Sequence, residues 1–303
     1  MTVAELCTLY LSEGVATKKA STIAMDRTRI NLHVIPLLGR RRARDIAQGD
    51  VERFMNAVAK RSGKGAASRT VGMLGGIFSF AVRKFICSKN PVRGVQRFED
   101  RKATRFLSLV ELARLGETLT TAEREGVNPY AVAAIRTLMF TGCRKAEILT
   151  LRWDDIDWEN DCLRLPESKT GAKTVALGAP AIELLHGLPR VDGNPYVFPG
   201  TKDRAHLVGL QKIWHQIRNR AELPDVRLHD LRHSFASVGA AGGDSLLIIG
   251  KLLGHKNAAS TQRYAHLGDD PLRSAANRIS QQIAAAMSGQ QEAEVVELKK
   301  SPA

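Results

Sequence analysis

The stretch CLRLPESKTGAKTVALG, residues 162–178, decides the fold class, because it is the one clear strand–turn–strand pattern in the chain. Apolar and polar residues alternate on both sides of a glycine-containing turn, as they do in an antiparallel hairpin with one buried face. The segments on either side of it carry apolar residues at helical spacing. The sequence therefore predicts a mainly α protein with a small β-sheet, an α+β fold.

Helices are expected on both sides of the hairpin. Ser108 caps one, with Glu111 three residues on completing a capping box, and further helices are predicted over residues 129–141, 144–151, 207–221, 228–239, 246–253 and 271–287. The segment at 129–141 ends at Gly142, a residue that commonly ends helices. The polar tail, residues 288–303, is expected to be disordered.

The first 98 residues are predicted to form a compact bundle of about four helices. A short one covers residues 4–11, and a second runs from a cap at Ser21 or Thr22 to about residue 35, before Pro36. Asp50 is expected to cap VERFMNAVAKR, and the loop SGKGAAS separates that helix from RTVGMLGGIFSFAVRKF. The polar segment FEDRKATR then indicates a linker. This gives a helical domain over residues 1–98, a linker at 99–105 and a second domain at 106–287.

The charge of the chain is concentrated near its N-terminus. The protein has 45 Lys and Arg against 31 Asp and Glu, a net charge of +14, and residues 1–105 alone hold 21 of the basic residues and 8 of the acidic ones. Such a surplus predicts a polyanionic partner, either nucleic acid or an anionic membrane surface. No apolar run approaches the roughly 18 residues of a membrane span. Four scattered cysteines without a C-x-x-C pair favour a reduced, cytoplasmic protein.

Five segments of the second domain carry candidate functional residues in a fixed order. Each of these residues alone is more often an ordinary surface or packing residue. They are Arg144 in TGCRKAEILTLRW with Glu147 on the same helix face, Lys169 at the hairpin turn in SKTGAKTV, His229 and Arg232 in LHDLRHSFA, His255 in LLGH, and Tyr264 in STQRYAH.

A metal site is the rival interpretation of LHDLRHSFA, because His229 and His233 are spaced i and i+4. A zinc protease motif would place Glu directly after the first His, where this chain has Asp230. No third ligand follows at a sensible spacing. We therefore expect no metal and no other cofactor.

The ordered set resembles the tyrosine recombinases, or phage-type integrases, over residues 106–285, and residues 1–98 more loosely resemble the helical, SAM-like core-binding domain of that family. The resemblance implies a catalytic domain that cuts and rejoins DNA strands through a 3'-phosphotyrosine intermediate. It implies that Tyr264 is the nucleophile, that Arg144 and Arg232 clamp the scissile phosphate, and that Lys169 is the general acid. His229 and His255 would complete the phosphate pocket, and Lys173 is a weaker candidate for the hairpin role.

The residue types suit that chemistry. Two guanidiniums stabilise the charge that develops on the phosphate oxygens. Nearby positive charge favours ionisation of a phenol, whose ordinary pKa is about 10. A lysine that protonates the leaving oxygen contributes a factor of about 10²–10⁴. A covalent intermediate preserves the bond energy, so strand exchange requires neither ATP nor paired metal ions.

Several functions stay open. We expect first a site-specific recombinase, the integrase of a phage or mobile element, acting on double-stranded DNA. The alternatives are an Xer-type dimer resolvase, a type IB topoisomerase-like enzyme and a non-catalytic DNA-binding protein. The chain starts almost at the core-binding helices, which indicates either the lack of an arm-binding domain or an N-terminal truncation.

The family resemblance also implies partners. It implies a homotetramer on paired DNA sites, accessory DNA-bending proteins as a further option, no membrane partner and a nucleoid-associated location in the cytoplasm. The helix at 271–287 would dock either on its own chain or on a neighbouring protomer.

Overall fold

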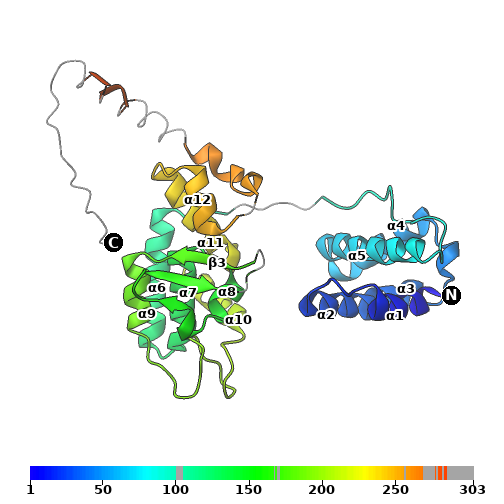
Figure 1. Cartoon of the computed structure of the whole chain (residues 1–303), viewed down its shortest axis with the longest axis horizontal. Helices are drawn as coiled ribbons and strands as arrows, with labels where there is room; N and C mark the ends of the chain where they lie inside the picture. The colour runs from blue at the N-terminus through cyan, green and yellow to red at the C-terminus, as the bar shows by residue number, and fades with distance from the viewer. Residues whose placement is uncertain are drawn as a thin grey trace, which may run out of the picture. The chain divides into compact units, whose positions relative to one another are not determined.

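In a computed structural model of the chain, the described residues are 1–99, 105–166, 168, 171–255 and 257–268, with a few isolated positions between 277 and 284. The chain divides into two compact units, Met1–Lys102 and Ala103–Ala303 (Figure 1). The division falls within residues 99–105, the segment predicted as a linker. Most of the predicted helix at 271–287, and all of the tail at 288–303, lie outside the described residues.

The N-terminal unit is a helical bundle. Its elements are α1 (Val3–Glu13), α2 (Ala20–Arg29), the π-helical turn η1 (Ile30–Val34), α3 (Ile35–Leu38), the 3-10 turn η2 (Ala43–Asp45), α4 (Gln48–Ser62) and α5 (Lys64–Arg83). The two longest helices, α4 and α5, pack against each other (Figure 1). Fully buried apolar side chains fill the space between the helices, among them Leu6, Val51, Leu74 and Phe78. Burial of this apolar face, rather than helix propensity, holds the bundle together.

Four details of this unit differ from the sequence prediction. Helix α2 begins at Ala20 after Lys19, so Ser21 and Thr22 lie inside it and do not cap it. The helical path does not stop before Pro36: the π-helical turn η1 leads directly into α3, and the proline lies in the first turn of α3. The predicted loop at 62–68 shrinks to Gly63, whose φ of 84° ends one helix and begins the next. Asp50 lies inside α4 instead of capping it from outside, and accepts a hydrogen bond from the Ala47 N–H at 2.9 Å.

The C-terminal unit is mainly helical and contains a three-stranded sheet. Its elements are α6 (Leu109–Arg124), α7 (Pro129–Thr141), α8 (Lys145–Leu149), η3 (Trp153–Asp155), β1 (Ile156–Asp157), β2 (Cys162–Leu165), β3 (Lys173–Ala176), α9 (Ala179–His186), α10 (Leu210–Arg220), α11 (Leu228–Ala241), α12 (Leu246–Leu253), η4 (Ala258–Ser260) and η5 (Gln262–Gly268). The sheet is antiparallel in the order β1-β2-β3, and Leu163 pairs with Val175. The predicted hairpin and the mainly α, α+β fold class are thus confirmed.

Helix α7 lies at the centre of this unit, and most of its residues are buried. Both α9 and α11 pack against it, and α11 in turn packs against α12 and η5. The helix ends at Gly142, whose φ of 60° is in the left-handed region. A Cβ atom at this position would lie 2.6 Å from the Phe235 ring, so only glycine fits this turn. The turn also lies against the end of α12, since the same Cβ atom would be 2.9 Å from the Leu253 side chain.

No helix in the described part of the chain is long and apolar enough to cross a membrane.

Candidate active site

Arg144 is the N-cap residue of α8, directly after the Gly142 turn. Arg144 donates two hydrogen bonds to the Glu147 carboxylate. Its backbone N–H donates to Oε2 at 2.9 Å, and its Nη1 donates to Oε1 at 2.7 Å. The Glu147 side chain is only 4% exposed, whereas that of Arg144 is 21% exposed. A buried carboxylate therefore orients a guanidinium that solvent, or an anionic ligand, can still reach.

Lys173, the first residue of β3, shares the same carboxylate. Its Nζ donates to Oε2 of Glu147 at 2.8 Å, and its side chain is 9% exposed. A Cβ atom at Gly254, whose φ is 66°, would lie 2.9 Å from the Lys173 Cδ. The backbone next to His255 therefore lies directly against this lysine. Lys169, the predicted hairpin general acid, lies outside the described residues.

Arg232 lies on α11 with only 3% of its surface exposed. Its Nη1 donates to the carbonyl oxygen of Gly142 and its Nη2 to that of Leu253, each at 2.6 Å. These bonds fix the guanidinium between the C-terminal ends of α7 and α12. Burial and, next, the charge of Arg144 lower the pKa of this arginine. Because each guanidinium acts electrostatically on the other, an anion beside both is favoured.

Two imidazoles lie within the field of these guanidiniums. Burial, followed by the charges of Arg232 and Arg144, lowers the pKa of His255 to about 4. Its Nδ1 lies 2.9 Å from Oγ1 of the buried Thr261. The pKa of His229 is also lowered, first by desolvation and then by Arg232. Both rings are therefore neutral near pH 7 and able to accept a proton.

Tyr264 lies in η5 and is 1% exposed. Its hydroxyl lies 2.6 Å from Nδ1 of His233, and its ring packs at 6.0 Å, centroid to centroid, from that of Phe106. Burial raises the pKa of the phenol, while the charges of Arg263 and Arg232 act in the opposite direction. The phenol is thus protonated and covered, beside the cationic group but not open to a solvent-borne ligand.

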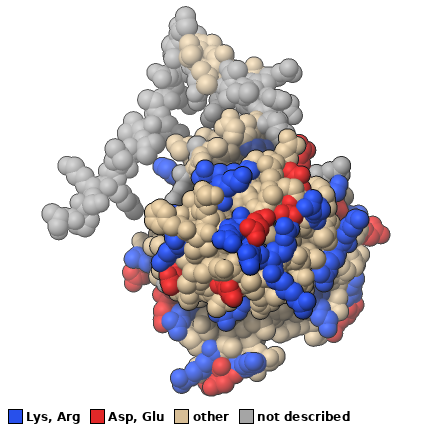
Figure 2. Space-filling view, turned by 90° about the vertical axis from the view of Figure 1, so that its right-hand side faces the viewer, with Lys and Arg blue, Asp and Glu red and all other residues tan. Residues whose placement is uncertain are grey.

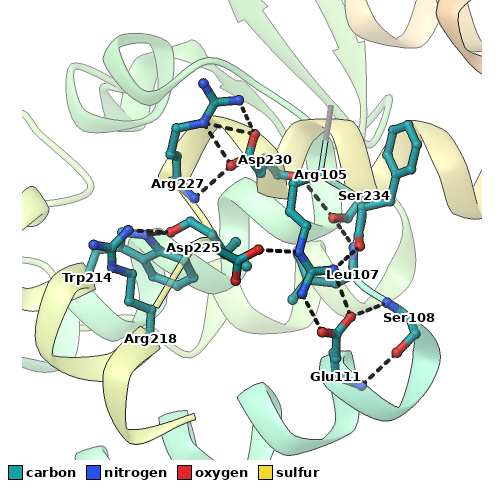
Figure 3. A network of polar contacts seen from close by, with 12 residues as sticks. Arg105, Leu107, Ser108, Glu111, Trp214, Arg218, Asp225, Arg227, Asp230 and Ser234 are labelled. Carbon is teal, nitrogen blue, oxygen red and sulfur yellow. Dashed lines mark hydrogen bonds and ion pairs between the residues drawn. The ribbon is translucent and has the colours of Figure 1, made fainter. Parts of the chain in front are cut away.

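A network of polar contacts joins the start of the C-terminal unit to α6 and α11 (Figure 3). Arg105 donates to Asp225 at 2.8 Å and to Glu111 of α6 at 2.5 and 3.1 Å. Two residues further on, the Leu107 N–H donates to Oγ of Ser234 on α11 at 3.0 Å. The start of the C-terminal unit is therefore tied both to α6 and to the helix that carries His229 and Arg232.

The structure gathers Arg144, His229, Arg232 and His255 into one field and puts Tyr264 at its edge. The sequence pattern indicated His233 only as a possible metal ligand and did not point to Thr261. The ring of His233 meets that of His229 edge to face, at 4.9 Å, and its Nδ1 is engaged by Tyr264. Its position next to Arg232 in the sequence was the available signal. The described residues contain no group of three or more potential metal ligands.

A mainly helical chain with this fold and these side chains is a DNA strand transferase of the tyrosine recombinase class. The chain belongs to the phage integrase family: the model of that family matches residues 106–270, and the model of the phage integrase central domain matches residues 4–97. It is therefore a site-specific DNA recombinase that cuts and rejoins strands.

Two relatives match this chain over stretches of different length. The tyrosine recombinase XerC of Pediococcus pentosaceus is 26% identical over 281 residues, which cover 88% of each chain. The prophage integrase IntF of Escherichia coli is 30% identical over 142 residues, 45% of this chain. That matched stretch spans only 30% of the length of IntF.

Solved integrases have the same fold. A lambda integrase dimer bound to a core site has a TM-score of 0.68 at 18% identity, covering 85% of this chain and 96% of that one. A Tn1549 transposon integrase in complex with transposon right end DNA has a TM-score of 0.74 at 16% identity, covering 92% of this chain and all of the other.

Proposed function

We propose that this recombinase is the integrase of a phage or mobile element and that it acts on double-stranded DNA through a 3'-phosphotyrosine intermediate at Tyr264. The convergence of Arg144, His229, Arg232 and His255, from three separate helices and turns, carries the proposal. A phosphodiester is the anionic group that suits a buried guanidinium beside a second, solvent-accessible one.

The proposed reaction assigns one task to each group. The Tyr264 oxygen bonds to the phosphorus while the bond from phosphorus to the 5'-oxygen breaks. Arg144 and Arg232 hold the non-bridging oxygens, whose charge grows in the transition state. Lys169 donates a proton to the leaving 5'-oxygen, and His229 and His255 assist the transfer of the phenol proton. Reversal by a different 5'-hydroxyl rejoins the strand without a cofactor.

The N-terminal unit is proposed to hold the duplex. Its exposed cations include Arg53, Lys60 and Arg61 on α4 and Lys64 and Arg69 on α5. The face shown in Figure 2 carries many more Lys and Arg side chains than Asp and Glu side chains. Such contacts give affinity without sequence readout and a steep dependence on salt. In this proposal residues 1–98 bind DNA and residues 106–287 carry the chemistry.

Assembly on paired sites is proposed from the solved relatives. One lambda integrase structure is a tetramer bound to a Holliday junction, at 18% identity and a TM-score of 0.67. Four copies of this chain would supply the four cleavages of a complete exchange. Accessory DNA-bending proteins, and a cytoplasmic, nucleoid-associated location, are part of the same proposal.

An Xer-type dimer resolvase is the second candidate, favoured by the match to XerC over 88% of both chains. Plasmids carrying two non-identical attachment sequences would separate the two functions. An integrase recombines the unlike pair, whereas a dimer resolvase acts on two copies of one site.

Covalent capture tests the proposal. A pooled library of nicked duplexes is incubated with the protein, and complexes that survive denaturation are recovered and sequenced. The wild-type protein is expected to trap a restricted set of sites, and Tyr264→Phe is expected to trap none. Equal trapping by Tyr264→Phe would remove Tyr264 as the nucleophile, and trapping of every sequence alike would favour a topoisomerase-like enzyme.

A further inference from the structure

His233 is the polar neighbour of the Tyr264 hydroxyl in the described structure, and none of the roles proposed above uses it. Its Nδ1 lies 2.6 Å from the phenol oxygen. The imidazole is 7% exposed and the tyrosine 1% exposed, so both ends of this contact are shielded from water. A hydrogen bond in such surroundings is worth more than one at the surface.

The proton in this bond belongs to the phenol. Burial, followed by the charges of His229 and Arg263, lowers the pKa of His233 to about 4, and Asp230 and Arg227 have smaller, opposed effects. The ring is therefore neutral near pH 7. Burial also raises the pKa of Tyr264. Of these two neutral groups the phenol is the stronger acid and the imidazole nitrogen the stronger base, so the phenol is the favoured donor to Nδ1. In that arrangement the ring carries its own proton on Nε2.

A second hydrogen bond fixes the same short segment. Oγ1 of the buried Thr261, three residues before Tyr264, lies 2.9 Å from Nδ1 of His255. The Tyr264 N–H donates to the Thr261 carbonyl at 3.0 Å. Residues 261–264 are thus attached at one end next to the cationic group and at the other end through the phenol. The Tyr264 ring also packs in an apolar cluster with Ile249 and Leu253, and the contact with His233 is the polar contact that holds its hydroxyl.

We propose that His233 is a positioning residue that holds Tyr264 in a closed resting position, through a hydrogen bond from the phenol to Nδ1. In that position the hydroxyl is covered, and a phosphate on a duplex cannot reach it in line. Release of this bond must precede attack. The consequence for strand cleavage rests on the proposed function, whereas the closed position is a property of the free protein.

Nitration of the tyrosines in the full-length protein tests the closed position without DNA. Tetranitromethane is applied to the wild-type protein, His233→Phe and His233→Asn, and each tyrosine is followed by peptide mass spectrometry. His233→Phe keeps a ring but no acceptor, and His233→Asn places an amide oxygen near the position of Nδ1. Removing one hydrogen bond of ordinary strength shifts an equilibrium roughly 2- to 10-fold. Nitration of Tyr264 should rise by about that factor in His233→Phe and stay near wild type in His233→Asn.

Internal standards make the comparison quantitative. Tyr130 and Tyr196, both half-buried in the same unit, should react alike in all three proteins. Cys143 is 3% exposed, and its continued resistance to a thiol reagent shows that the unit stays folded. Unchanged nitration of Tyr264 in a folded His233→Phe protein would overturn the proposal.

A spectroscopic measurement covers the case in which His233→Phe fails to fold. In the ¹⁵N spectrum of histidine-labelled wild-type protein, His233 should carry its proton on Nε2, and Tyr264→Phe should shift the Nδ1 signal of His233. A proton on Nδ1 in the wild-type protein would contradict the proposed direction of the bond.

Single-turnover cleavage of a nicked duplex distinguishes two roles of His233: holding Tyr264 in the resting position, or taking part in the attack. Since opening precedes attack, His233→Phe should form the covalent complex up to about 10-fold faster than the wild-type protein, by the same hydrogen-bond arithmetic. A slower reaction would instead make His233 part of the attack and overturn the holding role. If no protein forms the complex, the proposed function fails, while the nitration result still decides the resting position of Tyr264.

Discussion

The ammonium nitrogen of Lys173 lies 2.8 Å from Oε2 of Glu147, in a site where both side chains are almost completely buried. The same carboxylate binds Arg144. Glu147 thereby joins the edge of β3 to the first residue of α8 and fixes one of the two guanidiniums. The burial of this pair has a direct consequence for stability.

We expect Glu147→Ala to destabilise the C-terminal unit by about 3–5 kcal/mol, because it leaves the Lys173 charge buried without its partner. Chemical denaturation measures the loss. Lys173→Met should restore part of the lost free energy in the double variant, because it removes the stranded charge. Surface substitutions ordinarily change the free energy of unfolding by no more than about 0.5 kcal/mol. A change this small in Glu147→Ala would mean that the ion pair does not stabilise the fold.

Substitution of Lys169 should affect the rate of cleavage, whereas substitution of Lys173 should affect the stability of the fold. Lys169→Met is expected to slow cleavage by about 10²–10⁴-fold, since it removes the proposed acid for the leaving oxygen. A substrate whose leaving oxygen is replaced by sulfur needs no protonation and should restore its rate. Lys173→Met should instead lower stability. Rescue of Lys173→Met by the sulfur substrate, and not of Lys169→Met, would reverse the assignment.

Acid should destabilise the C-terminal unit before its carboxylates titrate. The pKa values of His233 and His255 are lowered from 6.5 to about 4, so the unfolded chain binds more protons than the native state between those values. Stability therefore falls as the pH drops from about 6.5 toward 4, by on the order of 2 kcal/mol for the buried His233. Denaturation at several pH values measures the slope. His233→Asn should flatten it, and an unchanged slope would contradict the shifted pKa.

Phe85 offers a test in the N-terminal unit. It is 95% exposed and has a φ of 56°, in the left-handed region that favours glycine. Phe85→Gly should raise the free energy of unfolding by about 0.5–1 kcal/mol, as strain relief exceeds the entropy that glycine adds to the unfolded chain. Phe85→Ala keeps the strained backbone and should be nearly neutral. Thermal unfolding compares the three, and a destabilised Phe85→Gly protein would show that the exposed ring has a folded-state role.

The sequence indicated the parts of the structure that depend on local pattern. Alternation around SKTGAK predicted the hairpin, and Gly142 predicted the end of α7. The sequence pattern did not predict the π-helical turn before Pro36. That turn depends on the packing of Ile30 and Val34 in the bundle. The two-residue strand β1 is too short to show alternation.

The candidate site was also predictable only in the part that depends on local sequence. The motifs gave the order of five residues: Arg144, His229, Arg232, His255 and Tyr264. The partner of Tyr264 was not predictable, because His233 is 31 residues away along the chain and only folding brings the two side chains together. Lys173 was likewise a weaker candidate in the sequence, and its buried contact with Glu147 spans 26 residues.

Peptide mapping of the covalent complex identifies both the attacking residue and the end of the DNA strand that it holds. The wild-type protein is trapped on a nicked duplex and digested, and the peptide that carries a nucleotide is sequenced by mass spectrometry. We expect a phosphodiester link between the Tyr264 oxygen and a DNA 3'-phosphate, with a free 5'-hydroxyl on the cleaved strand. A nucleotide attached to any other residue, or a 3'-hydroxyl with the protein on the 5'-phosphate, would contradict it.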